Sequence, residues 1–490
     1  MRKHFLFIVL FSSSFVAAAA QQQNEARQRF EEFRRKAHEQ FENFRDEANR
    51  KFAEFKEEAW KRYNKLPAIP KPEEDEIPPV IVPDDEKEKP IDSNPITIDE
   101  VVKPPKPEPQ PGPISPIHEQ PQPTENTVKF TYCGTECKVR FNDKSGLSLG
   151  DCSNARLTAL WNALSSEDYN NTIRDCLELR IRLRLSDWAY LNMINSFSEK
   201  CLGEGALANF LTAYIYCQSG YKMRLGRNGK DIWLLFASKH LIYKDDLFKI
   251  GDEYYYPYNC DAESMEIYDM PYPKEQPMSL FIQQTPLFDL KSSSSRVLTS
   301  KKYPDVSVNI SVNLNVIDFY NTYPTSEING NFMTRWAMYA NTPLDNNVKR
   351  DLYPVLKNCI QGLNQRDAAN KLINWVQTGF VYEYDENVWG EDRAFFAEES
   401  LYYPYCDCED RAILFSRLVR DLMGLKVVLV FYPGHLATAV HFTESVEGDY
   451  ITLNGERYVI SDPTFLGAGA PVGVTMPDMD NSSAKVILLE

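Results

Sequence analysis

The sequence predicts an α+β fold, in which a folded body follows a long helix and an extended linker. Three observations lead to this prediction. Residues 24–65 repeat an apolar pattern every 11 residues, residues 66–126 are rich in proline and acidic side chains, and helical and strand-like patterns follow one another from Val128 onward. The chain has 490 residues, of which 43% are hydrophobic and 12% aromatic, so it can build two or three domains with sizeable cores.

The first 20 residues have the pattern of a secretory signal peptide. Arg2 and Lys3 precede an apolar run that starts at Phe5, and the alanines at 17–20 offer a small-residue cleavage site. The apolar run is too short to cross a membrane. We therefore expect residues 1–20 to be removed and the mature protein to be exported and soluble, either periplasmic or secreted.

Residues 21–65 are predicted to form one long amphipathic helix. Ala26, Phe30 and Phe33 are followed by equivalent residues eleven positions later, and the pattern then continues. Eleven residues make three turns of about 3.67 residues each, so the aromatic side chains stay on one face. We favour self-association of this face, as in a coiled coil. Two alternatives remain, which are binding to a membrane surface, disfavoured because the polar face is not basic, and docking on the protein's own body.

Residues 66–126 are predicted to form a disordered linker. Proline recurs throughout, acidic residues dominate the charges, and aromatic residues are absent. Such a composition buries too little apolar surface to fold alone. The whole chain carries a formal net charge of -16, which argues against nucleic acid as a partner.

Residues 127–345 are predicted to form a mixed α/β N-terminal body. A hairpin is expected around Gly134, helices over 153–225, and aromatic strands over 231–257. The order of a helix, Gly220-Tyr221 and two strands resembles the order found later around Cys408. This similarity indicates an internal duplication, to which we assign no chemistry because no matching set of Cys, His and Asp accompanies it.

Residues 346–490 are predicted to form a catalytic domain. Cys408 stands at the start of a buried helix that runs to Met423 and ends at Gly424. His435 begins a strand, and Asp462 ends a later strand, where Pro463 stops it.

The order of these three residues suits thiol acyl transfer. A helix start favours a thiolate, so we expect a lowered pKa at Cys408. An Asp on a neighbouring strand can orient the imidazole of His435. Cys406 is the rival nucleophile and His441 the rival base. His441 lies roughly 20 Å further along the strand, so the two histidines cannot both reach Cys408.

The run from Cys408 to Leu414, the later His435 and Asp462-Pro463-Thr464 resemble the transglutaminase-like superfamily, and in particular the bacterial transglutaminase-like cysteine peptidases. The resemblance covers roughly residues 347–490. It implies a papain-like core with Cys408 as nucleophile, His435 as base and Asp462 as orienting acid. The sequence departs from the family pattern at Ala437, where an aromatic residue is usual, and in having Cys406 and Asp407 before the nucleophile.

The resulting hypothesis is an exported cysteine peptidase or amidase that acts on a protein or peptide substrate. The alternatives are a transglutaminase that joins glutamine to amines, and an inactive binding scaffold. The oxyanion donor is expected to be the backbone N–H of Cys408, with the side chains of Gln377 and Trp389 as further candidates. We expect no cofactor and assign no metal ligands.

Overall fold

The structure is a computed structural model of the chain. It describes residues 60–72, 76–84, 92–114, 117, 126–142, 147–243, 246–272 and 274–490, together with isolated positions between 28 and 52. The proposed signal peptide lies outside the described residues, as does most of the predicted long helix. Within the described part of the chain, no helix is long and apolar enough to cross a membrane.

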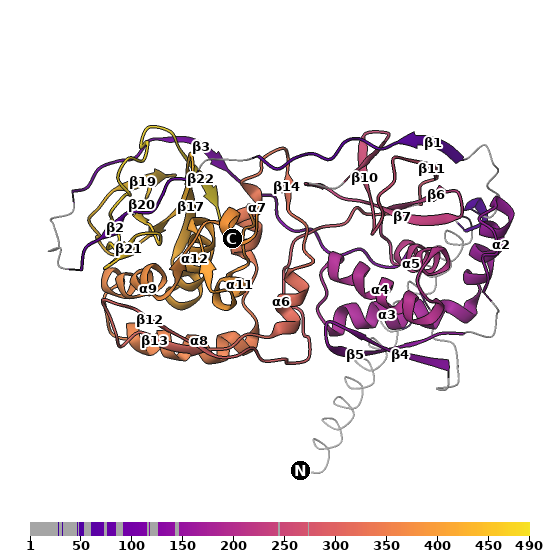
Figure 1. Cartoon of the computed structure of the whole chain (residues 1–490), viewed down its shortest axis with the longest axis horizontal. Helices are drawn as coiled ribbons and strands as arrows, with labels where there is room; N and C mark the ends of the chain where they lie inside the picture. The colour runs from indigo at the N-terminus through magenta and orange to yellow at the C-terminus, as the bar shows by residue number, and fades with distance from the viewer. Residues whose placement is uncertain are drawn as a thin grey trace, which may run out of the picture.

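The fold is a mixed α+β arrangement in two lobes that lie side by side (Figure 1). The N-terminal lobe contains a hairpin, β4 (Thr127–Tyr132) and β5 (Thr135–Arg140), and the helices α2 (Asn154–Leu164), α3 (Asn170–Arg182), α4 (Asp187–Leu202) and α5 (Ala206–Gln218). Its six-stranded sheet is built from β1 (Trp60–Asn64), β6 (Met223–Asn228), β7 (Asp231–Ala237), β9 (Phe248–Ile250), β10 (Glu253–Pro257) and β11 (Ser264–Tyr268).

The C-terminal lobe contains the candidate site. Its helices include α7 (Thr334–Asn341), α8 (Asn346–Ile360), α9 (Gln365–Gly379), α10 (Asp385–Val388), α11 (Ala397–Tyr402) and α12 (Cys408–Met423). Its six-stranded sheet is built from β3 (Ile98–Val102), β17 (Lys426–Tyr432), β18 (His435–His441), β19 (Tyr450–Leu453), β20 (Glu456–Ser461) and β22 (Ala484–Leu488). Short pairs add β12 (Arg296–Thr299) with β13 (Ser307–Ile310), β15 (Val381–Tyr382) with β16 (Tyr405–Cys406), and β2 (Ile81–Val82) with β21 (Leu466–Gly467).

Between the lobes lie α6 (Leu314–Tyr320) and the pair formed by β8 (His240–Ile242) and β14 (Ser326–Ile328). One continuous cluster of buried apolar side chains runs through both lobes, from Leu157 on α2 to Leu418 on α12. The lobes therefore share a hydrophobic core, and neither is an independent domain joined to the other only by a linker.

The two sheets have the same strand order. In the N-terminal lobe the order is β9-β10-β7-β6-β11-β1, and in the C-terminal lobe it is β19-β20-β18-β17-β22-β3. In each lobe a helix, α5 or α12, directly precedes the central hairpin and packs on it. Of the strands that follow each helix, the five that belong to the sheet pair in the same antiparallel way. This agreement supports the internal duplication that the sequence indicated.

The predicted long helix is wrong at its end. Residues 60–64 form the edge strand β1, antiparallel to β11. Trp60 is buried, and the guanidinium of Arg227 lies 4.5 Å from the centre of its ring. Upstream, Phe52 stacks on Trp161 with ring centroids 4.0 Å apart. At this point the chain docks on its own body, which is one of the two alternatives to self-association.

The prediction of a disordered linker is also wrong where residues 66–126 are described. The strand β3 joins β22 in parallel and completes the C-terminal sheet. The side chains of Ile96, Val102 and Ile114 are buried. Composition misled here because an edge strand needs only backbone hydrogen bonds and a few apolar anchors, both of which the folded body supplies.

The C-terminal lobe begins well before the predicted boundary at residue 346. The indole N–H of Trp375 on α9 donates to the carbonyl of Leu298 on β12, at 3.0 Å. The ring of Trp336 on α7 packs against Phe431 on β17, with centroids 5.5 Å apart. Segments from about residue 296 therefore belong to the body that holds the candidate site.

Candidate active site

The buried helix α12 begins at Cys408, as predicted. Its N-cap is Asp407, whose backbone N–H points at the carboxylate of Asp410 (3.4 Å), and its end is Gly424 in the left-handed conformation (φ 68°). Apolar side chains on one broad face, including Ile413 and Leu418, lie in the core. The start of α12 is thus held rigidly at the surface of the sheet formed by β17 and β18.

His435 and Asp462 are brought together by strand pairing. Thr438 of β18 lies opposite Ser461 of β20, so the first residue of β18 lies near the residue that follows β20. The imidazole Nε2 of His435 is 2.8 Å from the Asp462 Oδ2, and both side chains are almost fully buried. The other ring nitrogen, Nδ1, is buried without a hydrogen-bond partner among the described residues. The imidazole is therefore oriented by the carboxylate and keeps one nitrogen free to exchange a proton.

Cys408 lies next to this pair. Its sulfur accepts from the backbone N–H of Leu436, the residue after His435, and its thiol donates to the Glu409 Oε2 at 3.3 Å. The candidate nucleophile and the candidate base thus come from the starts of α12 and β18.

The two rivals lie elsewhere. Cys406 is on β16, opposite Tyr382, and its sulfur is 3.9 Å from the carbonyl of Val381. His441 is at the far end of β18, opposite Lys426, and its Nδ1 is 2.9 Å from the carbonyl of Arg457. His441 also has a carboxylate neighbour, but its Nε2 is 4.0 Å from the Glu456 Oε1 and both side chains are partly exposed, unlike the buried 2.8 Å contact between His435 and Asp462.

The prediction that the helix start lowers the pKa of Cys408 is wrong for this structure, in which the thiol is buried. Burial raises the pKa of the thiol well above its ordinary value, and the carboxylates of Glu409, Asp407 and Glu76 raise it further. The hydrogen bond from the N–H of Leu436 lowers the pKa of the thiol but does not outweigh them. The prediction considered the helix start but not the surrounding negative charge, two of whose sources flank the cysteine in sequence.

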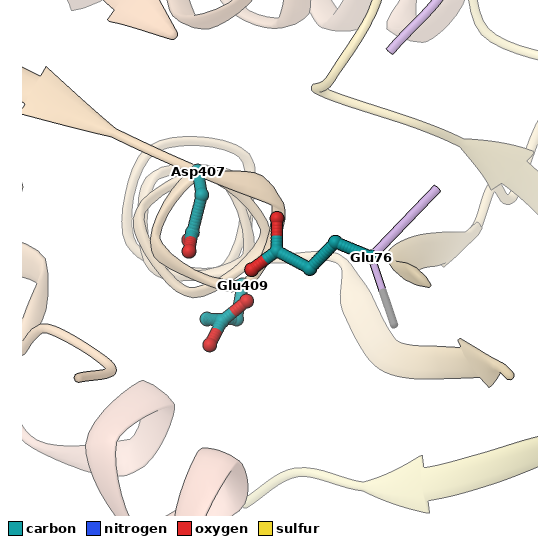
Figure 2. A group of neighbouring side chains, drawn as sticks. All are labelled: Glu76, Asp407 and Glu409. Atoms are coloured by element: carbon teal, nitrogen blue, oxygen red, sulfur yellow. The ribbon is translucent and has the colours of Figure 1, made fainter. Parts of the chain in front are cut away.

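A cluster of buried and half-buried carboxylates surrounds the start of α12. Figure 2 shows the carboxylate of Glu76 reaching toward the start of the helix, where Asp407 and Glu409 lie. One oxygen from each of these three lies within 4.8 Å of the others. Two overlapping groups have the same spacing, namely Asp385, Asp392 and Glu409, and Asp385, Asp407 and Asp410.

The charges in this cluster are only partly balanced. Arg335 lies 3.2 Å from Asp392 and 3.9 Å from Glu409, and Lys71 pairs with Asp392. Burial would raise the pKa of Asp392, but these two cations bring it below its usual value. Burial and the neighbouring Glu409 raise the pKa of both Glu76 and Asp385 to about 8.

The cluster has the chemistry of a site for a hard cation. Burial and the carboxylates of Glu409 and Asp410 raise the pKa of Asp407 well above its usual value, and both its oxygens are buried without a hydrogen-bond donor among the described residues. Oxygen-only ligands of this kind suit Ca²⁺ or Mg²⁺. The sequence assigned no metal ligands; the structure shows that Glu76, Asp407 and Glu409 could hold such an ion beside the thiol.

The two side chains named as oxyanion candidates are placed differently from the expectation. The Gln377 amide donates to the carbonyls of Asp462 (2.7 Å) and Ala470 (3.0 Å), so it positions the chain around Asp462. Trp389 packs edge-on against Tyr403, at 4.9 Å between centroids, and lies under the guanidinium of Arg393. The backbone N–H of Cys408 is left as the oxyanion candidate.

Sequence reasoning missed the residues that come from distant segments. Asp407 and Glu409 were visible as neighbours of Cys408, whereas Glu76 and Arg335 carry no local signal that places them there.

Comparisons of the chain with protein-family models, with curated proteins and with solved structures each found no match.

Proposed function

We propose that this protein is a thiol-dependent acyl-transfer enzyme, a peptidase or amidase with a papain-like, transglutaminase-like catalytic core. The observation that carries the proposal is the buried contact between His435 and Asp462 beside Cys408. Burying a carboxylate beside an imidazole costs free energy, because the carboxylate loses its contact with water. Such a pair is typical of sites where the carboxylate fixes the orientation of the imidazole for catalysis. Its free nitrogen Nδ1 is the atom that would take the thiol proton.

The chemistry follows from these atoms. The Cys408 thiol, which donates to the Glu409 Oε2 in this structure, turns to His435 Nδ1 and gives it the proton, and the sulfur attacks an amide carbonyl carbon. The oxygen that becomes negative is stabilised by the N–H of Cys408 at the start of α12. The C–N bond then breaks, the imidazolium protonates the departing amine, and a thioester remains. Water converts the thioester to an acid and restores the thiol.

A primary amine in place of water would give a cross-linked product, as in a transglutaminase. No described residue favours one acceptor over the other. Hydrolysis is the simpler proposal because water needs no second binding site. An inactive scaffold is the remaining alternative, and the oriented imidazole argues against it.

The test is product formation from a broad peptide mixture. The full chain, and a chain opened as described below, would be incubated with peptides, with or without a biotinylated amine. New peptide termini would identify a hydrolase, and incorporated biotin a transglutaminase. Both products should vanish in Cys408→Ala and in His435→Ala. If the opened chain with Cys408 and His435 intact makes neither product beyond the level of the opened Cys408→Ala chain, the proposed function is wrong.

A further inference from the structure

Residues 76–82 lie against the chain on both sides of the candidate triad. The backbone N–H of Ile77 donates to the carbonyl of Gly434, the residue before His435, at 2.9 Å. Further along, β2 runs parallel to β21, shortly after Asp462 in the sequence. The N–H of Leu466 donates to the carbonyl of Val80, at 3.0 Å. The segment is thus an extended strand bound by backbone hydrogen bonds.

The same segment reaches the nucleophile. The carboxylate of Glu76 lies within 4.8 Å of those of Asp407 and Glu409, the residues on either side of Cys408. The hydroxyl of Tyr382 holds Glu76 from the other side, at 3.3 Å. With the segment in place, Cys408 is only 4% exposed and His435 only 2%. A substrate carbonyl has no route to a thiol buried to this degree.

The body is shaped to accept this segment closely. Gly467 has φ +75°, and a Cβ there would lie 2.1 Å from the carbonyl oxygen of Val82. The side chains of Ile77, Val80 and Val82 pack on the apolar cluster of the C-terminal sheet. The neighbouring Ile81 points outward and is 71% exposed.

We propose that residues 76–82 are an internal plug that occupies the substrate groove and keeps the enzyme latent until it is displaced. The proposal rests on the proposed function and adds the form of the substrate. The groove is filled by an extended backbone that is hydrogen-bonded beside His435 and to β21. The substrate that replaces the plug is therefore an extended polypeptide bound in the same way.

The test measures how fast iodoacetamide alkylates Cys408 in the full chain, with the modified peptide identified by mass spectrometry. Wild-type Cys408 should react as slowly as the core residue Cys217, which is 1% exposed. Val80→Asp combined with Ile77→Pro places a charge on the apolar cluster and removes the donor to Gly434. This variant should raise the rate at Cys408 at least tenfold.

Ile81→Asp is the matched control. It adds the same charge to the same strand, but at a side chain that is 71% exposed, so the rate at Cys408 should not change. Cys217 and Cys406 report on folding, because both are buried and should stay protected in every variant. If wild-type Cys408 reacts as fast as an exposed thiol, the plug does not exist.

A second variant separates folding from the release of the segment, because the chain is cut only after it has folded. A site-specific protease sequence in place of residues 85–90 would be cut after the chain has folded with the Val80→Asp change. Cutting should then raise the rate at which iodoacetamide alkylates Cys408 at least tenfold. If Cys408 stays protected after verified cutting, the segment is a permanent part of the fold and the proposal is overturned. If Cys408 becomes exposed but no acyl-transfer product forms, the plug is retained and the proposed function fails.

Discussion

The two lobes share one order of strands, apart from an edge strand that is antiparallel in one sheet and parallel in the other, but they differ in the residues at the ends of these strands and helices. His435 begins β18, and the equivalent strand β7 begins with Asp231. Cys408 and His435 are separated by the same number of residues as Glu204 and Asp231, so Glu204 takes the position of Cys408 in the N-terminal lobe. In the N-terminal sheet Tyr258 lies opposite Leu234, and in the C-terminal sheet Ser461 lies opposite Thr438 in the same register. Asn259, the residue after Tyr258, therefore takes the position of Asp462. The comparison teaches that one strand order can be kept while the side chains at the ends of its elements differ, and the proposed chemistry depends on those side chains.

The sharpest test of this difference is to change the equivalent position in each lobe. His435→Ala should lower kcat/KM of the opened chain by about 10²–10⁴-fold, because the imidazole carries the proton. Asp231→Asn should leave it unchanged, and His441→Ala should have a far smaller effect than His435→Ala. Steady-state kinetics on one peptide substrate would measure all three. Equal losses for His435→Ala and Asp231→Asn would show that both lobes contribute to catalysis.

A second test asks whether the lobes are one folding unit. Leu211 on α5 and Phe415 on α12 stand equally far before Gly220 and Gly424, and both are buried. Replacing either with Ala should lower the free energy of unfolding by about 2–5 kcal/mol. Because the core is continuous, urea unfolding should stay a single transition in both variants. The exposed Ile181, changed to Ala, is the control. Two separate transitions, with only one shifted, would contradict the shared core.

A third test concerns the carboxylate cluster, which only the C-terminal lobe has around its equivalent helix start among the described residues. Ca²⁺ at about 100 times its Kd should stabilise the fold by about 2.7 kcal/mol, because it binds the native state alone. Thermal unfolding with Ca²⁺ and with chelator would show the shift. Asp407→Asn should remove it, whereas Glu204→Gln should not. An equal Ca²⁺ effect in Asp407→Asn would mean that the ion binds elsewhere.

The smallest expected effect is the change that Glu398→Gln makes to the pH dependence of stability, because Glu76 and Asp385, whose pKa values are also raised to about 8, contribute to that dependence as well. Burial raises the pKa of Glu398 to about 8 and that of Glu399 to about 7, from an ordinary value of 4.5. Because these pKa values are raised in the folded state, the stability they contribute is complete below about pH 4.5. It is lost as the pH rises toward 8. The Tm should therefore fall between pH 5 and pH 8.5, and less so in Glu398→Gln. A Tm that rises over this interval would contradict the assignment.

The sequence allowed the local parts of the site to be predicted. A helix start at Cys408, a strand start at His435 and a strand end at Asp462 each depend on nearby residues, and the strand order brings them together. The electrostatics could not be predicted in the same way. Glu76 and Arg335 come from other segments to the carboxylates that flank Cys408, and their contacts depend on tertiary structure. The same holds for β3, whose proline-rich surroundings are typical of disorder until a sheet edge is present to pair with it.

The edge strands that close the two sheets set an order for assembly. The N-terminal sheet is closed by β1 against β11, so all of its strands exist once residue 268 has been made. The C-terminal sheet is closed by β3 against β22, which joins residues 98–102 to residues 484–488. Such a distant pairing is slow to form, because a long stretch of chain must be closed into a loop first. During synthesis the strands of the N-terminal sheet can therefore pair early, whereas the sheet of the C-terminal lobe is completed only after β22 emerges.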